Sequence, residues 1–174
     1  MRNFGVLMEK LRSGRTAVAS FALCFVVGLF VWGAKKPVQP IAFNHKKHIE
    51  NGVGCTDCHS GAQEQARATL PELSTCMTCH ESALGQSPEE AKVRAAAAAG
   101  RELVWTQLTR VPTHVYFSHR RHVQEGKVEC AVCHGEMQKR SVPPTARFRP
   151  LDMNDCINCH IQRGVYTDCN DCHR

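Results

Sequence analysis

Residues 43–59 read FNHKKHIENGVGCTDCH: a Phe-x-His-x-x-His unit, a loop with two glycines and a Cys-x-x-Cys-His motif. The same parts return at residues 117–134 as FSHRRHVQEGKVECAVCH, with one more residue in the loop. A second Cys-x-x-Cys-His follows each copy, and a fifth motif comes soon after the fourth. The sequence therefore predicts two modules of two motifs each and one terminal motif.

Cys-x-x-Cys-His is the attachment motif of c-type haem. Two thiols one turn apart meet the two vinyl groups of one porphyrin, and the next histidine is held beneath the iron as proximal ligand. The five copies use ten of the 11 cysteines and five of the 10 histidines, so we expect five covalently bound haem c groups. The predicted attachment residues are Cys55, Cys58, Cys76, Cys79, Cys130, Cys133, Cys156, Cys159, Cys169 and Cys172, and the predicted proximal ligands are His59, His80, His134, His160 and His173.

Three other uses of paired cysteines explain the pattern less well. A structural zinc site needs four ligands from two such pairs, but it does not require a histidine after every second cysteine. A disulfide framework leaves those five histidines unexplained. A thioredoxin-like redox site uses one Cys-x-x-Cys in a βαβ setting rather than five.

The other five histidines would supply one further ligand for each iron, with a surface position as the alternative for the isolated His114. Two histidines three residues apart share one helix face, so they cannot take opposite sides of one iron, and each His-x-x-His should serve two haems. Two axial ligands leave no open iron position, which favours electron transfer over catalysis by this chain. We expect Phe43 and Phe117 to pack against porphyrin faces. The distal candidates are His45, His48, His114, His119 and His122, with Met153 as a rival donor.

Residues 16–34, TAVASFALCFVVGLFVWGA, carry no charge and are about long enough to cross a membrane as one helix. Positive residues before this run predict that residues 1–15 are cytoplasmic and residues 35–174 periplasmic. A cleaved signal peptide is the competing interpretation, but it favours a shorter apolar core and a small residue where Trp32 stands. Most of the formal charge of +6 precedes residue 37, and haem propionates would make the domain acidic, so nothing supports nucleic-acid binding.

The predicted fold is mainly α with extensive loops, because no alternating strand pattern recurs. Large apolar side chains are sparse after residue 37, so the haems should supply most of the core. We expect a module at 40–80, a linker helix at 87–100, a module at 112–160 and the terminal motif within 161–174. Ser87 as N-cap, Pro88, a capping box closed by Glu90 and a final Gly100 predict the linker helix, interpreted as a simple connector.

The segments PIAFNH (40–45), CMTCH (76–80), VYFSHRRH (115–122) and PLDM (150–153) resemble those of class III multihaem cytochromes c. More closely, they are similar to the membrane-anchored multihaem subunit of alternative complex III and related quinone reductase complexes. The resemblance implies a low-spin haem chain beside an iron–sulfur/molybdopterin-like subunit and a polytopic quinol-binding subunit. Some relatives carry a histidine where this chain has Thr109, which makes His114 a replacement candidate.

The sequence thus predicts a single-pass, pentahaem electron carrier of the cytoplasmic membrane, without enzyme activity of its own. It would serve a quinol-oxidising respiratory complex and pass electrons to a periplasmic acceptor such as a monohaem cytochrome. One alternative is a free-standing quinol dehydrogenase that donates to periplasmic reductases. Another is a multihaem reductase with one open iron, which high-spin spectra or carbon monoxide binding would reveal.

Overall fold

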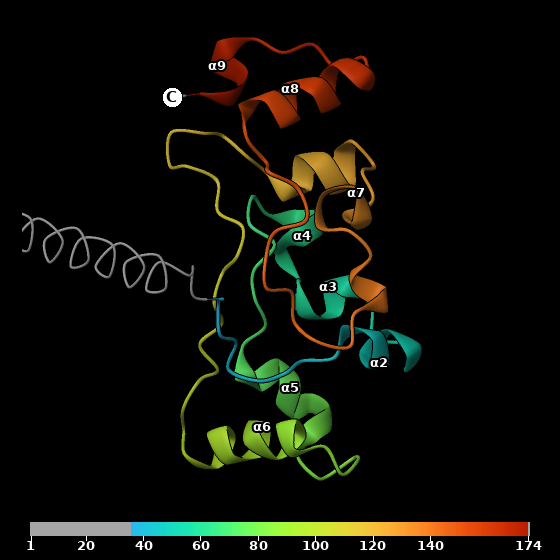
Figure 1. The fold of residues 1–174 in the computed structure, drawn as a ribbon, viewed down its shortest axis with the longest axis vertical. Coiled ribbons are helices and arrows are strands. Elements are labelled where there is room, and N and C mark those ends of the chain that lie inside the picture. Colours follow the sequence, from blue (N-terminus) through green and yellow to red (C-terminus); the bar gives the residue numbers. More distant parts are fainter. Residues whose placement is uncertain (1–35, 174) are drawn as a thin grey trace, which may run out of the picture. The chain divides into compact units, whose positions relative to one another are not determined.

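The computed structural model of the protein describes residues 36–173. The segments predicted as cytoplasmic (1–15) and membrane-spanning (16–34) lie outside these residues. Among residues 36–173, no helix combines the length and apolar character needed to cross a membrane. Short helices joined by long loops build this part of the chain (Figure 1), as predicted for a mainly α domain. Its β pairing is limited to an isolated bridge between Val115 and His173.

The two modules have the same order of elements: a helical turn with the His-x-x-His unit, a helix at the first motif, a short helical turn and a helix that contains the second motif. The first module contains α2 (His45–Glu50), α3 (Cys55–Cys58), α4 (Gly61–Glu64) and α5 (Leu73–His80), and α6 (Pro88–Ala98) follows it. The second contains the π-helical turn η1 (Arg121–Glu125), α7 (Cys130–His134), the 3₁₀ turn η2 (Met137–Lys139) and α8 (Met153–Gln162). The terminal motif forms α9 (Cys169–Cys172).

The extra loop residue of the second copy is absorbed as a π-helical turn. In α2 the amide of Asn51 donates to the carbonyl of Lys47, four residues back. In η1 the amide of Gly126 donates to the carbonyl of Arg121, five residues back, at 2.8 Å. A π turn accommodates one inserted residue without breaking the helix, so the two His-x-x-His units keep equivalent surroundings.

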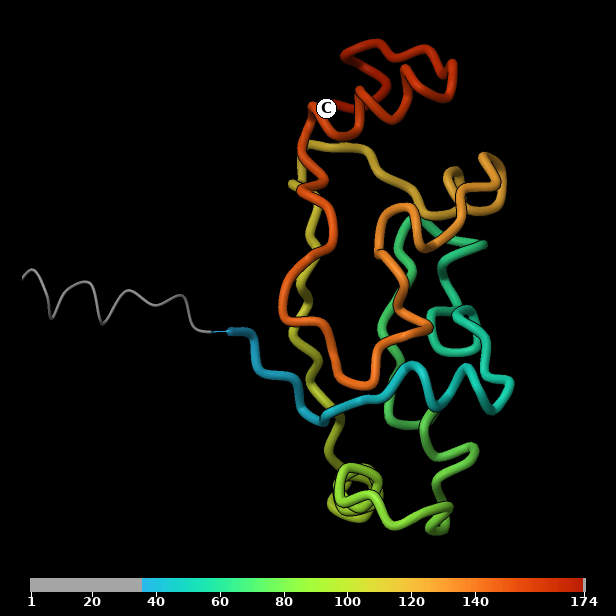
Figure 2. The backbone as a smooth tube through the Cα atoms, turned by 45° about the vertical axis from the view of Figure 1, so that its right-hand side comes forward, coloured from blue at the N-terminus to red at the C-terminus, as the bar shows by residue number. Residues whose placement is uncertain are grey.

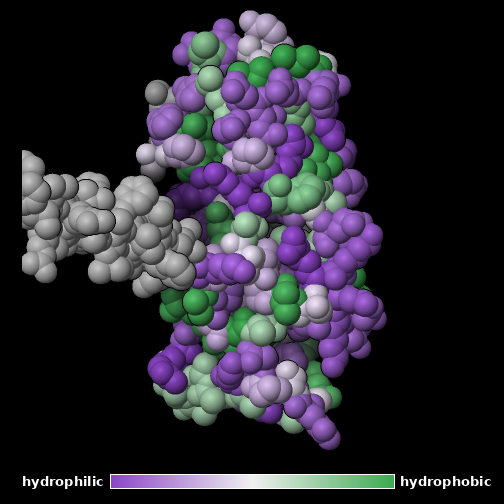
Figure 3. Space-filling model, in the orientation of Figure 1, coloured by the Kyte–Doolittle hydropathy of each residue, from purple (hydrophilic) through white to green (hydrophobic). Residues whose placement is uncertain are grey.

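A small apolar cluster forms where α5 packs on α6. Its buried members are Ile41, Leu73, Val93 and Ala96, and the partly buried Phe43, Met77 and Trp105 pack against it. Elsewhere in residues 36–173 only Ala62 is a buried apolar residue, and no large side chain is fully buried. On the face drawn in Figure 3, apolar residues are scattered among hydrophilic ones. The polypeptide alone thus builds little core, as the composition predicts.

Helix α6 has the predicted N-cap, but the predicted capping box is wrong. The hydroxyl of Ser87 accepts the amide of Glu89 at 3.3 Å, and Pro88 opens the helix. The carboxylate of Glu90 instead accepts the amide of Leu84, because the preceding loop folds back over the helix start. The simple-connector interpretation is also wrong, because α6 contributes Val93 and Ala96 to the apolar cluster.

Residues 101–113 form an extended segment that leads from α6 toward the C-terminal helices (Figure 2). Thr106 of this segment exchanges two hydrogen bonds, at 2.9 and 3.0 Å, with the side chain of Gln39 near the start of the domain. The indole of Trp105 donates to the carbonyl of Pro71 at 3.2 Å. At the far end the amide of Tyr116 donates to the carbonyl of Cys172 at 2.8 Å. The segment therefore connects the beginning of the domain with its end.

Candidate functional site

Five sites, numbered in chain order, are defined by the motifs at residues 55–59, 76–80, 130–134, 156–160 and 169–173. A helical turn places the two cysteines and the histidine of a motif on one side of the backbone. In sites 1 and 5 the motif's own aspartate stabilises that turn. Asp57 accepts the amide of Gly54 at 2.7 Å, and Asp171 accepts the amide of Asp168 at 2.9 Å. These aspartates explain why a helix of four residues forms there.

Each of the ten motif cysteines is exposed or partly exposed, and none of them forms a disulfide with another described cysteine. Burial, as the main cause, raises the pKa of Cys58, Cys76, Cys130, Cys133 and Cys156. Burial thus favours the uncharged form of these sulfur atoms. The two thiols of a motif lie one turn apart, which is the arrangement needed for two thioether bonds to one porphyrin.

The predicted proximal and distal histidines lie in facing pairs. Ring centroids are 6.1 Å apart for His48 and His80, 6.4 Å for His119 and His134, 6.0 Å for His122 and His160, and 5.7 Å for His114 and His173. His45 lies near His59. Burial is the largest cause that lowers the pKa of His45, and the neighbouring His59 is the next. Each proximal histidine thus has a distal candidate next to it.

These distances fit two imidazoles on opposite sides of one metal ion. Metal–imidazole bonds are about 2 Å long, so two ring centres across one ion are about 6 Å apart. The interplanar angles range from 7° for His119 and His134 to 63° for His48 and His80, and opposed ligands can rotate about their common axis. Histidines of one His-x-x-His unit face different motifs: His48 faces site 2 and His122 faces site 4.

Backbone carbonyls orient four of the imidazoles. The Nδ1 atom of His48 contacts the carbonyl of Asn44 at 2.8 Å, and that of His122 contacts the carbonyl of Ser118 at 2.8 Å. His59 and His119 make the same kind of contact with Thr69 and Ala66, at 2.9 and 3.1 Å. A carbonyl accepts only from a protonated Nδ1, so Nε2 keeps its lone pair and is free to bind a metal.

Three further imidazoles lack such a partner. The Nδ1 atoms of His45, His80 and His160 are buried and form no well-aligned hydrogen bond. Burial, as the largest cause, lowers the pKa of His45, His119 and His134. These rings are therefore held neutral, which is the form that binds a metal ion.

Phe43 and Phe117 contact the imidazoles of their own His-x-x-His units. Phe43 stacks on His48 with ring centroids 4.3 Å apart, and Phe117 stacks on His122 at 4.7 Å. Each phenyl ring also meets the first histidine of its unit edge-on at 4.8 Å. These phenyl groups therefore restrict the orientation of the imidazole rings, and their packing on porphyrin faces stays a prediction.

His114 and Met153, the two rival donors, differ in position. His114 stacks against His173 with an interplanar angle of 14°, close to the Val115–His173 bridge. Met153 is the first residue of α8, and its side chain is 61% exposed. The geometry therefore brings His114, and not Met153, to site 5.

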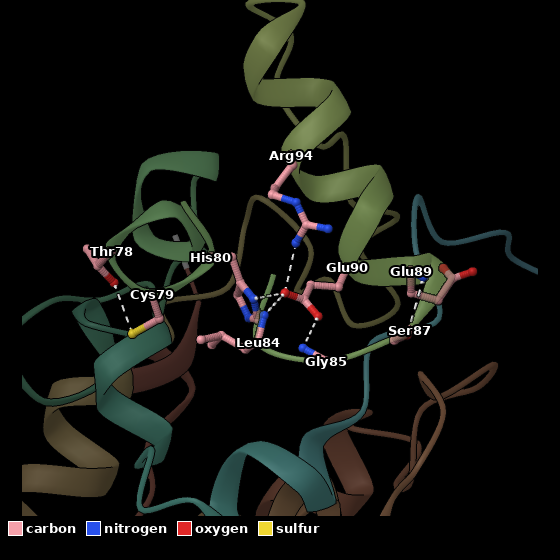
Figure 4. A network of polar contacts seen from close by, with 9 residues as sticks. All are labelled: Thr78, Cys79, His80, Leu84, Gly85, Ser87, Glu89, Glu90 and Arg94. Carbon is pink, nitrogen blue, oxygen red and sulfur yellow. Dashed lines mark hydrogen bonds and ion pairs between the residues drawn. The ribbon is translucent and has the colours of Figure 1, made fainter. Parts of the chain in front are cut away.

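Glu90 is the residue at these sites that sequence reasoning missed. Its Oε1 atom lies 3.3 Å from the buried Nδ1 of His80 (Figure 4). Glu90 and Arg94 are four residues apart in one helix, a spacing that predicts an ion pair, and this pair is present at 2.8 Å. No spacing rule points from Glu90 to His80, because the contact depends on how α6 packs on α5.

The donor set fits c-type haem. Within residues 36–173, no three cysteine, histidine or acidic side chains converge as a metal cluster. Instead, opposed imidazoles leave space for a flat group between them, and paired thiols lie on the helices that carry them. This arrangement suits a porphyrin that is bound at its edge and ligated on both faces.

Comparison with known proteins agrees with the geometry. The family model described as "Cytochrome c7 and related cytochrome c" matches residues 41–98 and 115–174. A relative from Nitratidesulfovibrio vulgaris, the "Menaquinone reductase, multiheme cytochrome c subunit", is 31% identical over 92% of each chain. This chain therefore belongs to the family of cytochrome c7 and related multihaem cytochromes c, which bind haem c covalently.

Proposed function

We propose that this chain is a membrane-anchored pentahaem cytochrome that carries electrons within a quinone-linked respiratory complex. The observation that supports this most strongly is the set of opposed histidines, four pairs of which have ring centroids 5.7–6.4 Å apart. In this proposal the motif cysteines attach five haems, and His59, His80, His134, His160 and His173 are the proximal ligands. The distal ligands of sites 1 to 5 are, in that order, His45, His48, His119, His122 and His114.

Haem iron accepts and releases one electron, and the protein sets its environment. Two histidines on each iron leave no position for substrate, so the chain acts as a conductor and not as a catalyst. The stacked Phe43 and Phe117 keep the distal rings in place, and the carbonyls of Asn44 and Ser118 keep their Nδ1 atoms protonated. Such restraint limits ligand motion when the iron changes oxidation state.

The contacts between sites support a linear order of 2–1–3–4–5, which differs from the order of the motifs in the chain. Sites 2 and 1 are neighbours, because Cys58 lies close enough to Cys76 to raise its pKa, after burial as the larger cause. Sites 1 and 3 meet where burial and the nearby Cys55 thiol raise the pKa of Cys130. The amide of His119 also donates to the carbonyl of Ala66 at 3.0 Å. Figure 1 places α5, α3 and α7 in the same succession.

Sites 3, 4 and 5 continue this order. Burial chiefly raises the pKa of Cys133, and Cys159 of site 4 adds to that shift. Burial chiefly raises the pKa of Cys156, and Asp155 and then Cys172 of site 5 add to that shift. Helices α7, α8 and α9 follow one another in Figure 1. Sites 2 and 5 are thus the two ends at which electrons would enter and leave.

The proposal includes the anchor and the partners. Residues 16–34 would span the cytoplasmic membrane, with residues 1–15 inside and residues 35–174 on the periplasmic side. The modules would be residues 40–80 and 112–160, followed by the terminal motif. An iron–sulfur/molybdopterin-like subunit and a polytopic quinone-binding subunit, as in alternative complex III, would flank the chain. The sequence-based expectation is quinol oxidation, but the relative's name favours menaquinone reduction, so we propose electron flow toward the quinone.

Purification from native membranes tests this proposal. We expect mass spectrometry to find five added haem groups, and optical and EPR spectra to show low-spin haem with no carbon monoxide shift. Larger subunits should co-purify, and a menaquinone analogue should reoxidise the reduced haems of the complex.

A high-spin signal with rapid carbon monoxide binding would contradict the conductor role and favour the multihaem reductase. Isolation without partner subunits would favour the free-standing quinol dehydrogenase, and haem reduction by menaquinol alone would reverse the proposed direction.

A further inference from the structure

Within residues 36–173, the proximal histidine of site 2 is the one that has a carboxylate within 4 Å. Glu90 Oε1 lies 3.3 Å from His80 Nδ1, and the Glu90 side chain is only 8% exposed (Figure 4). The Nδ1 atom of His80 is buried without another hydrogen-bond partner. The carboxylate is therefore the polar group available to that nitrogen.

Contacts that do not involve His80 hold Glu90 in place. Oε1 accepts the amide of Leu84 at 2.7 Å, and Oε2 accepts the amide of Gly85 at 3.1 Å. The guanidinium of Arg94 donates to Oε1 at 2.8 Å. Two backbone amides and one guanidinium thus donate to Glu90, which favours its ionised form and fixes the carboxylate beside His80.

Site 4 provides an internal comparison, because its distal side matches that of site 2. His48 and His122 both contact a carbonyl through Nδ1 at 2.8 Å and both stack on a phenyl ring. On the proximal side, the Nδ1 of His160 is buried and has no hydrogen-bond partner. Among the direct contacts of the ligand rings, sites 2 and 4 therefore differ in the presence of Glu90.

We propose that Glu90 is a positioning residue that lowers the reduction potential of the haem at site 2 relative to that at site 4. A carboxylate that accepts from Nδ1–H makes the imidazole a stronger electron donor to its metal and favours the oxidised ion. Arg94 offsets part of this negative charge. The inference rests on the proposed function in one respect, because it requires His80 to be an iron ligand.

Three variants of the full pentahaem chain test the proposal by spectroelectrochemical titration. Glu90→Gln removes the charge and should favour reduction of one haem about tenfold, which is about 59 mV for a one-electron couple. Arg94→Gln removes the offsetting cation and should shift the same haem in the opposite direction. Glu89→Gln is the matched control, because Glu89 pairs with Lys92 and the amide of Ala42, so no potential should shift.

His48→Met assigns the affected haem. A thioether ligand raises the potential, so this variant should separate site 2 from the other four components. Glu90→Gln in that background should move the separated component alone.

Equal shifts of Glu90→Gln and Arg94→Gln in one direction, or no shift in either, would overturn the proposal. If Glu90→Gln fails to assemble with five haems, Arg94→Gln tests the proposal alone: a lower potential of one haem supports it, and a higher or unchanged potential contradicts it. Failure of the proposed function would be distinguishable, because the unmodified chain would then lack five low-spin components.

Discussion

The two modules present their histidines in the same way but support them differently. Phe43 and Phe117 stack on the second histidine of their units at interplanar angles of 24° and 26°. Every buried apolar residue in the described part of the chain lies in residues 41–98, where α6 packs on α5. Residues 115–173 contain none. Similar ligand geometry thus forms with and without an apolar core nearby.

In the second module a polar contact joins the two motif helices. Arg149 donates through Nε to Asp155 at 3.1 Å and through Nη1 to the carbonyl of Val132 at 3.4 Å. It therefore connects α7 with α8, whereas in the first module Leu73 of α5 packs in one cluster with Val93 of the following helix α6. Polar contacts of this kind stabilise less than apolar burial. We therefore expect the second module to depend more strongly on its haems.

Withholding haem should have the largest effect. A chain produced without haem attachment should show no cooperative melting transition in calorimetry, because the polypeptide alone buries too little apolar surface. Hydrogen exchange should show the greatest loss of protection in residues 115–173, which lack buried apolar side chains. An apo chain that melts cooperatively would contradict the idea of a haem-built core.

Removing one distal ligand in each module should have the next largest effect. His48→Ala and His122→Ala should each convert one haem in five to a high-spin form that binds carbon monoxide. The two variants should behave alike, because both rings have the same phenyl and carbonyl contacts. The neighbouring exposed residues provide controls, Lys47→Ala and Arg121→Ala, which should remain low-spin.

Leu73→Ala should destabilise the haem-loaded protein by about 2–5 kcal/mol, because it opens a cavity beneath α6. Leu73 is 6% exposed, whereas Leu84 is 66% exposed. Leu84→Ala should therefore change the free energy of unfolding by less than about 0.5 kcal/mol. Denaturant titration measures both, and equal effects would show that the apolar cluster does not support the first module.

Arg149→Met should have the smallest effect of the four, about 1 kcal/mol, because both partners of its ion pair are partly exposed. Arg120→Met is the control in the same module, since Arg120 and Glu125 are more than half exposed. It should leave stability unchanged. If added salt weakened the unmodified protein without affecting Arg149→Met, the link between α7 and α8 would be established as electrostatic.

Several features of the fold could be predicted because they depend on local spacing. The motif helices follow from cysteines three residues apart, and the start of α6 follows from Ser87 and Pro88. The role of Glu90 could not be predicted, because a capping box and a contact with a distant histidine require the same residue type. Residue type left His114 with Met153 as a rival donor. The fold distinguishes them, because it stacks His114 on His173 and leaves Met153 exposed.

The sequence by itself determined the class of cofactor and predicted the attachment residues and the division into modules, because covalent attachment depends on residues that are close in the chain. The tertiary structure decided which histidine faces which motif, the order 2–1–3–4–5 of the sites and the position of the carboxylate beside His80. These features join residues that are far apart in the chain, such as His114 and His173. Chain packing alone brings such residues together, so no local pattern encodes their contact.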